Sequence, residues 1–133
     1  MDQLVKLEQA MSEIRYPEMR KELLSHLRAL SDPEYQRRVW VAKGKEGGIE
    51  HDEFDYAVHF LYDDTQLAED PRSTIGWILN DDSEAELIAN LVRILECLFQ
   101  EHGTDLSDAQ YIGLPEWRGV VSAARKALSI MRE

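Results

Sequence analysis

Hydrophobic residues recur every three or four positions along most of the chain, and polar residues fill the positions between them. This spacing places the hydrophobic side chains on one face of a helix, so it predicts amphipathic α-helices. The clearest of these helices starts at Ser83 and Glu86, which have the spacing of a capping box, and ends at Gly103. Helices are predicted over about residues 4–14, 17–30, 33–43, 83–102, 107–112 and 115–131.

Several of these helices have recognisable first residues. Pro17 and Pro115 suit the first helical turn, where a missing backbone N–H costs nothing. Asp32 is a favoured N-cap and precedes another proline. Ser107 and Gln110 have the spacing of a second capping box. These local signals support the periodicity.

Two segments fit more than one structure. Residues 54–62 match both a helical spacing and a strand alternation. We favour a helix because the alternate face, which contains Ala57 and Leu61, is not cleanly polar. Residues 38–41 fit the third helix or a short strand, and residues 73–79 fit a short helix or an extended piece. The pattern therefore predicts an all-α fold, a compact bundle of five to seven helices, with room for one short hairpin or extended segment near residues 54–79.

Size and composition indicate one globular domain. The chain has 133 residues, of which 44% are hydrophobic, enough to build a core. The glycine-rich segment at residues 43–48 is a flexible connection, but each side is too small for a core of its own, so we expect a single helical domain over residues 1–133. With one cysteine, no signal sequence and no apolar run of about 18 residues, a cytoplasmic protein without membrane contact is expected.

Negative charge is concentrated in one part of the chain. Twelve of the 26 acidic residues lie between Glu50 and Glu86, where Arg72 is the only lysine or arginine. This acidic zone accounts for the whole net charge of −11. Such a field attracts a basic partner and repels nucleic acid. Part of it has a simpler explanation, because Asp82 and Glu84 sit where a helix N-terminus favours negative charge.

Two histidines inside the acidic zone are the candidate metal ligands. His51, Asp55, His59 and Asp63 are spaced four residues apart, so a helix would place them on one face. Together they would span about 18 Å, so at best an adjacent pair could share one ion. No motif for a nucleophile, a phosphate loop or a dinucleotide is present. The sequence therefore predicts no enzymatic activity and no cofactor.

Two further features bear on the acidic zone. Trp77 lies in a short element inside it, and an aromatic residue surrounded by carboxylates suits a protein interface. Arg118, Arg125 and Arg132 recur every seven residues on the last predicted helix. We expect this stripe to face part of the acidic zone and to reduce its self-repulsion.

Four short motifs stand out between about residues 50 and 130: Asp63-Asp64-Thr65, Asp70-Pro71, Ile75-Gly76 and Pro115-Glu116-Trp117. On these motifs the segment resembles a family of small bacterial proteins that are acidic, mostly helical and uncharacterised. The resemblance transfers no catalytic residue. In size, charge and helicity the chain is also similar to small acidic immunity proteins encoded beside bacterial toxins, which implies a toxin as partner.

We therefore expect a non-enzymatic interaction domain that binds a basic protein, in the sharpest version a toxin such as a nuclease. The alternative is a metal-binding protein or metal-dependent enzyme that uses His51 or His59 with nearby carboxylates. Nucleic acid is not expected as a partner, and the chain is expected to be a monomer or a homodimer. The residues expected at the interface are Asp52, Glu53, Asp55, His59, Asp63, Asp64, Glu69, Asp70 and Trp77.

Overall fold

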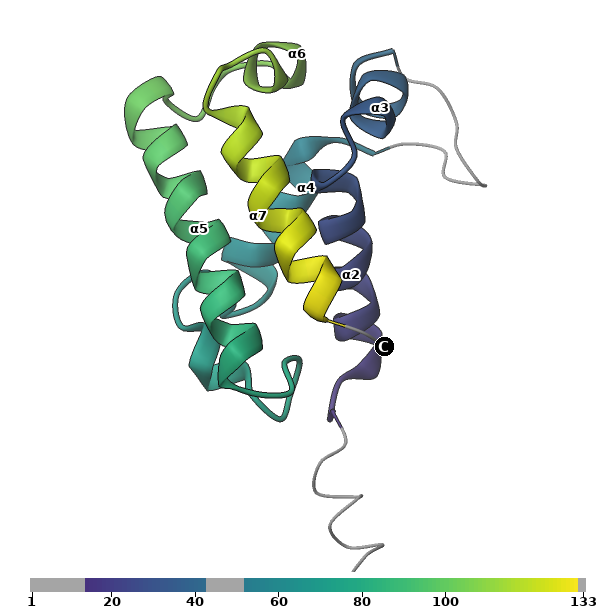
Figure 1. Ribbon diagram of the computed structural model, residues 1–133, viewed down its shortest axis with the longest axis vertical. Helices are drawn as coiled ribbons and strands as arrows, with labels where there is room; N and C mark the ends of the chain where they lie inside the picture. The colour runs from purple at the N-terminus through teal and green to yellow at the C-terminus, as the bar shows by residue number, and fades with distance from the viewer. Residues whose placement is uncertain (1–13, 43–51, 132–133) are drawn as a thin grey trace, which may run out of the picture.

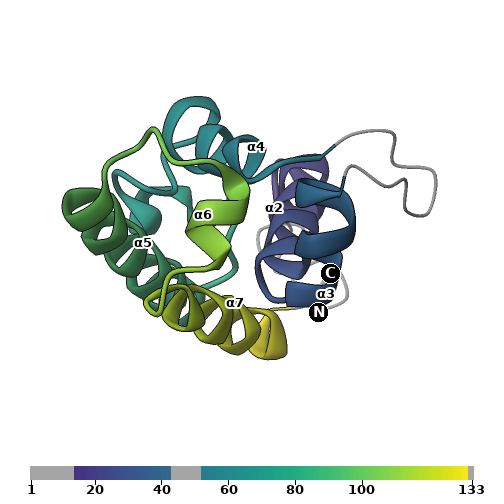
Figure 2. The ribbon, with the colours of Figure 1, turned by 90° about the horizontal axis from the view of Figure 1, so that it is seen from above.

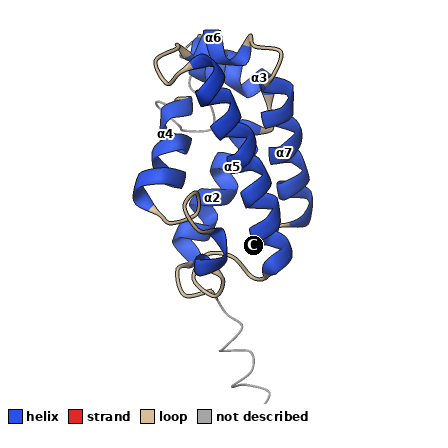
Figure 3. Ribbon diagram, turned by 90° about the vertical axis from the view of Figure 1, so that its left-hand side faces the viewer, coloured by secondary structure: helices blue, strands red, loops and turns tan. Residues whose placement is uncertain are grey.

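The computed structural model describes residues 14–42 and 52–131, and within these ranges it consists of helices joined by loops (Figure 3). The described part contains no strand, only one isolated bridge between Ile75 and Leu79. The all-α prediction is therefore confirmed. The elements are α2 (Pro17–Leu30), α3 (Pro33–Tyr35), η1 (Gln36–Val41), α4 (Phe54–His59), η2 (Phe60–Asp64), η3 (Pro71–Thr74), α5 (Asp82–His102), α6 (Asp108–Ile112) and α7 (Trp117–Ile130).

Helix α7 holds the bundle together, because it packs against both α2 and α5 (Figure 1). Seen from above, α4 lies on the side of the bundle opposite α7, while α2 and α5 close the other two sides (Figure 2). The short helices α3 and α6 lie at the same end (Figure 1). The buried side chains form one hydrophobic cluster that all these elements share. None of the described helices has the length and hydropathy needed to cross a membrane.

Several predicted helix ends agree with the structure. Pro17 is the first residue of α2, and the Asp32 side chain accepts a hydrogen bond from the Tyr35 N–H at 3.2 Å. Ser107 and Gln110 form the predicted capping box at the start of α6. Helix α5 ends at Gly103, whose φ of +82° is a conformation that glycine adopts without strain.

The predicted capping box of Ser83 and Glu86 is wrong. Helix α5 starts one residue earlier, at Asp82, and its N-cap is Asp81, whose carboxylate accepts from the Glu84 N–H at 3.1 Å. Ser83 donates its hydroxyl to the same carboxylate. Aspartate is as good an N-cap as serine, and here it lies at the position where the chain turns into the helix. The last helix also differs slightly, since α7 starts at Trp117, two residues after Pro115.

Two of the three ambiguous segments are helical, and the third is only partly so. Residues 54–62 lie in α4 and η2, with Phe54, Ala57 and Leu61 buried, so the favoured helix is confirmed and the strand alternative is wrong. Residues 38–41 belong to the π-helical η1 rather than to a strand. Residues 73–79 begin in the 3₁₀ helix η3 and continue as a turn at Gly76, where φ is +88°. The predicted helix over residues 4–13 and the connection at residues 43–48 lie outside the described residues.

A buried ion pair between Arg20 and Glu84 joins α2 to the first turn of α5. Each residue is only 4% exposed. Arg20 donates through Nη1 and Nη2 to the two carboxylate oxygens of Glu84, at 2.8 and 3.0 Å. Arg20 Nη1 also donates to the Ile78 carbonyl at 3.0 Å, and the Asn80 N–H donates to Glu84 at 2.8 Å. Both charges are therefore paired and hydrogen bonded, which is the condition for burying them.

A second buried polar residue, Gln36, closes the end of α2. It is fully buried, and its Nε2 donates to the carbonyls of Ala29 and Leu30 at 2.8 and 3.0 Å. Helix ends leave such carbonyls without partners, so the amide supplies the missing donors. Its Oε1 accepts from the Trp117 indole N–H at 2.9 Å. Gln36 thus fixes α2, η1 and α7 relative to one another.

Replacement of one partner of the buried ion pair should destabilise the fold strongly. Glu84→Gln removes the carboxylate charge that pairs with the buried Arg20, so we expect the free energy of unfolding to fall by roughly 3–5 kcal/mol. Urea denaturation followed by circular dichroism measures this. The matched control is Glu86→Gln on the exposed side of the same helix, which should cost less than about 1 kcal/mol. Equal losses from both variants would show that the pair contributes nothing specific.

Candidate functional site

The carboxylates of the acidic zone are divided between the interior and the surface. Glu84 is in the buried ion pair, and Asp81 caps α5. Asp52, predicted as an interface residue, accepts from the Tyr35 hydroxyl at 2.7 Å and from the Trp40 indole N–H at 3.0 Å. Asp52 is thus used inside the molecule, where it holds the start of the α4 segment to η1.

His59 lies between two of the predicted interface carboxylates. Its Nε2 is 3.2 Å from Asp55 Oδ2, and its Nδ1 contacts Asp63 Oδ2. The hydrogen bond to Asp63 and the charge of Asp55 raise the pKa of His59 above its usual value. All three side chains are more than half exposed. Because carboxylates occupy both ring nitrogens, the geometry favours a charged imidazolium over a neutral metal ligand. His51, the other candidate ligand, lies outside the described residues.

Of the remaining predicted interface residues, Asp64 and Trp77 line a groove and the others lie on the surface outside it. Asp64, Glu69 and Asp70 are exposed, and Asp64 lines the groove of about 320 Å³ together with Trp77. The indole of Trp77, 40% exposed, stacks on Tyr16 with ring centroids 5.4 Å apart. The Arg15 guanidinium also contacts the indole, with Cζ 4.6 Å from the ring centroid. One face of the indole is therefore already covered by residues of the chain itself.

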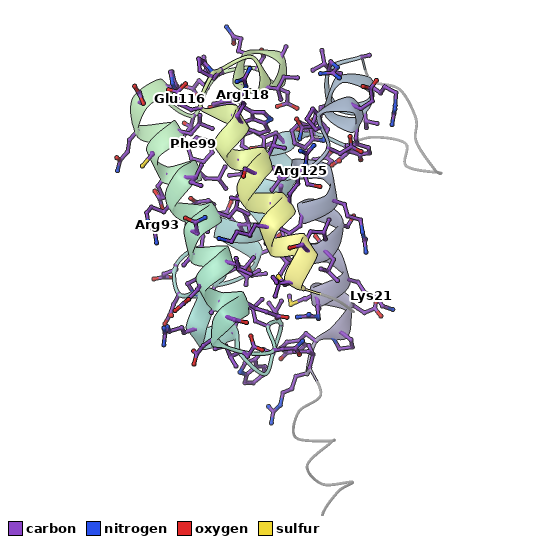
Figure 4. The ribbon with its side chains drawn as sticks, in the orientation of Figure 1. Lys21, Arg93, Phe99, Glu116, Arg118 and Arg125 are labelled. Atoms are coloured by element: carbon purple, nitrogen blue, oxygen red, sulfur yellow. The ribbon has the colours of Figure 1, made fainter. Side chains whose placement is uncertain are left out.

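The basic residues of α7 lie away from the acidic zone, contrary to our expectation. Arg118 and Arg125 both come from α7, which is across the bundle from α4 (Figures 2 and 4). Arg125 Nε donates to the Ser31 carbonyl at the end of α2, at 3.0 Å. Within the zone, Arg72 contacts Asp82 and Glu86 at 3.4 and 4.0 Å. Arg132 lies outside the described residues. The basic stripe therefore leaves the carboxylates of α4 unneutralised.

A cleft lined by charged and aromatic side chains lies between α4, the second half of α5 and the segment that leads into α6. Its volume is about 550 Å³, within the range of ordinary ligand pockets. Five carboxylates line it, and none of the described residues that line it is a lysine or an arginine. We call it the acidic cleft. Its lining consists of Glu53, Phe54, Asp55, Val58, Tyr62, Glu96, Phe99, Thr104, Asp105, Leu106, Asp108 and Tyr111.

Helical spacing brings these side chains together. On the α4–η2 helix, Phe54, Val58 and Tyr62 are four residues apart and therefore share one face. On α5, Glu96 and Phe99 are three residues apart and face them. Phe54 and Phe99, with ring centroids 6.1 Å apart, form the apolar floor. The cleft is thus an aromatic surface with a rim of carboxylates.

Two hydrogen bonds fix the far wall of the acidic cleft. Tyr111 of α6 donates its hydroxyl to the Gly103 carbonyl at 2.7 Å, which holds the segment after α5. Asp108 accepts from the Phe54 N–H at 3.1 Å and so caps the start of α4. These contacts join residues that are 8 and 54 positions apart in the sequence. The wall is therefore a product of the tertiary fold.

Tyr62 has an unusual environment inside the acidic cleft. Its hydroxyl oxygen is buried and has no hydrogen-bond partner among the described residues. Burial, followed by the negative charge of Glu96, raises the pKa of Tyr62 to about 12. Glu96 thus acts on the phenol by its charge and by a contact with the hydroxyl that falls short of hydrogen-bond geometry. A buried hydroxyl without a partner costs on the order of 1–3 kcal/mol, so this residue is suboptimal for stability.

Sequence reasoning missed three carboxylates of the cleft, because Glu96, Asp105 and Asp108 lie outside the acidic zone. The only local signal was the spacing of Glu96 and Phe99 on the predicted helix. It also missed a group at the adjoining helix ends, where Glu101, His102 and Glu116 offer ligand atoms within 4.8 Å of one another. There, His102 Nε2 lies 2.6 Å from Glu116 Oε2, and this hydrogen bond lowers the pKa of Glu116. The group therefore pairs internally across α5 and α7.

Comparison with known proteins identifies the family of the chain. Residues 14–133 match a family described as a domain of unknown function, DUF7945, so the chain belongs to that family. The match includes α2 and η1 as well as the segment from which the sequence resemblance was drawn. No curated protein and no solved structure matches the chain.

The ionisation of His59 should depend on its carboxylate neighbours. We expect NMR titration of its ring protons to give a pKa above the usual value of about 6.5, and Asp63→Asn to lower it. Because the folded-state pKa is raised, any stabilisation by this contact is complete below about pH 6.5 and is lost as the pH rises through the folded-state pKa. Asp70→Asn is the control and should leave the pKa of His59 unchanged. A wild-type pKa at or below the usual value would contradict the observed geometry.

Removal of the unpartnered hydroxyl should not harm the fold. We expect Tyr62→Phe to leave the free energy of unfolding unchanged or to raise it by about 1 kcal/mol, since a buried polar group without a partner is removed. Tyr111→Phe is the matched control, because its hydroxyl bonds to Gly103. That variant should lose about 1 kcal/mol. The opposite order of the two variants in thermal or urea denaturation would show that Tyr62 has a partner in solution.

Proposed function

We propose that this protein is a non-enzymatic interaction domain that binds a basic protein partner through the acidic cleft and the carboxylates beside it. The observation that carries the proposal is the lining of the cleft, with five carboxylates and no lysine or arginine among its described residues. A concave aromatic surface with such a rim has the chemistry of a site for positively charged groups.

The interface we propose differs in part from the sequence-based prediction. Glu53 and Asp55 line the acidic cleft itself, and Asp63 follows on the same helix. Asp64, Glu69 and Asp70 extend the negative surface beyond the end of η2. Asp52 is used internally and is left out. Glu96 and Asp105 are added from α5 and the segment after it.

The mechanism of such an interaction is electrostatic. Helix α4, which carries Asp55, lies across the bundle from α7, which carries Arg118 and Arg125 (Figure 2). This separation gives the molecule a negative side, which accelerates the encounter with a basic surface by roughly 10- to 1,000-fold at low salt. In its sharpest form, the partner is a basic toxin such as a nuclease, and the carboxylates occupy the surface that phosphates would occupy. The size, acidity and helical fold of the chain support this form.

The alternative function, metal binding through His51 or His59, has less support. His59 directs both of its ring nitrogens at carboxylates, which suits a charged imidazolium. Asp55 and Asp63 contact opposite sides of that ring and do not converge on one point with it. The interaction function is therefore the one we put forward for test.

A pull-down experiment tests the proposed function. The variant Asp63→Asn/Asp64→Asn/Glu69→Gln/Asp70→Asn removes four charges from the proposed interface. The control Glu18→Gln/Glu22→Gln/Glu34→Gln/Glu86→Gln removes four charges from other exposed positions. We expect wild type and control to retain the same basic partner at low salt and to release it at high salt, while the interface variant retains at least about tenfold less. Equal recovery by all three proteins would remove the proposal.

A further inference from the structure

We propose that the acidic cleft is a receptor for a single arginine side chain of the basic partner. This inference rests on the proposed function and specifies the chemical group that the cleft accepts. It follows from three properties of the cleft: its apolar floor, its carboxylate rim and its unpartnered hydroxyl.

The floor of the acidic cleft suits a flat cation. Phe99 presents a partly exposed ring to it, Phe54 lies beneath at only 2% exposure, and Val58 and Leu106 extend the apolar surface. Aromatic faces attract cations, and the attraction grows when the cation is shielded from water. A guanidinium group is planar and weakly hydrated, so it stacks on such a surface at a smaller desolvation cost than an ammonium group. The three methylene groups of an arginine stem can cover the apolar part.

The rim supplies acceptors on both sides of the cleft. Asp55 lies on the α4 side, while Glu96 and Asp105 lie on the α5 side and in the segment after it. Neither Glu96 nor Asp105 forms an ion pair with a lysine or arginine in the described ranges. Guanidinium presents five N–H donors in a fixed plane, so it can donate to carboxylates on opposite walls at once. The compact ammonium group of lysine cannot span the cleft in this way.

Tyr62 is unfavourable in the free protein, and a bound arginine would offset that cost. Its hydroxyl is buried without a hydrogen-bond partner, and Glu96 is its charged neighbour. A guanidinium that binds Glu96 from the open side would fix that carboxylate in one orientation. A fixed carboxylate can then also accept the hydroxyl proton of Tyr62 from the buried side. Tyr62 is therefore a positioning residue, and its cost in the free protein is offset when the arginine is bound.

The acidic cleft also adjoins the exposed carboxylates that would attract a basic partner. Its α4 wall and the exposed carboxylates at Asp63 and Asp64 belong to the same continuous helix. A basic surface drawn to these carboxylates therefore comes to rest beside the opening of the cleft. The outer carboxylates increase the rate of encounter, and the cleft adds a specific contact.

Peptide titration of the full chain tests the inference. Three blocked peptides, Gly-Arg-Gly, Gly-Lys-Gly and Gly-citrulline-Gly, are added to the ¹⁵N-labelled protein at low salt. Citrulline has the shape of arginine without its charge. We expect the arginine peptide to shift the signals of Val58, Phe99 and Asp105, the lysine peptide to bind at least about threefold more weakly, and the citrulline peptide to cause no shift.

Matched variants make the assignment specific. Glu96→Gln should weaken the arginine peptide about fivefold, whereas Glu86→Gln, the same change on the same helix, should have no effect. Tyr62→Phe should weaken binding about two- to threefold without loss of stability, and its remaining shifts at Glu96 should be smaller. A merely structural role of Tyr62 would leave the shifts at Glu96 unchanged.

Defined results would overturn the inference. Equal effects of Glu96→Gln and Glu86→Gln, equal binding of the arginine and citrulline peptides, or tighter binding of spermidine than of the arginine peptide would each do so. The last result would assign the cleft to a free polyamine. The cleft can fail these tests while retention in the pull-down still depends on Asp63, Asp64, Glu69 and Asp70. That result would reject the arginine receptor and would leave the proposed binding of a basic protein intact. If no basic protein is retained in the pull-down, the proposed function fails as well.

Discussion

The buried ion pair between Arg20 and Glu84 is the constraint on which the rest of this small bundle depends. Burial of two charges is tolerated only when each is paired and hydrogen bonded. Here both side chains are buried, and two hydrogen bonds hold them in one geometry. That geometry sets the start of α5 against α2 and fixes the turn through Ile78 and Asn80 between them. Helix α7 then packs against both, so the position of α5 also decides where the wall of the acidic cleft lies.

The acidity of the chain serves two separate purposes in the folded molecule. Glu84, Asp81 and Asp52 accept hydrogen bonds from the protein itself, and each joins parts of the backbone. The carboxylates of α4 and of the loop after η2 are exposed, and α4 lies across the bundle from α7 (Figure 2). A count of charges along the sequence cannot separate these groups, because an internal acceptor and an exposed carboxylate have the same formal charge.

The acidic cleft combines features that oppose stability. It places five carboxylates around aromatic rings, and it holds the Tyr62 hydroxyl without a partner. Asp108 caps α4, but folding alone gives no reason to place Glu96 and Asp105 here or to keep the hydroxyl unpaired, since like charges repel and an unpaired hydroxyl is costly. Such a site becomes favourable when a positively charged ligand binds to it. For a chain that belongs to a family of unknown function, the cleft is therefore the surface to test first.

The sequence by itself determined most of the helices, because their signals are local. Pro17 at the start of α2, the Ser107 and Gln110 box and Gly103 after α5 act within a few residues, and the apolar residues on both alternate faces favoured a helix for residues 54–62. Only the tertiary structure decided which charges are buried and which carboxylates share a cleft. Arg20 meets Glu84 across 64 positions, and Glu96 joins α4 through packing that no local pattern encodes. The physical reason is range: caps and periodicity act between neighbours, whereas burial and charge pairing depend on every element that packs against the residue.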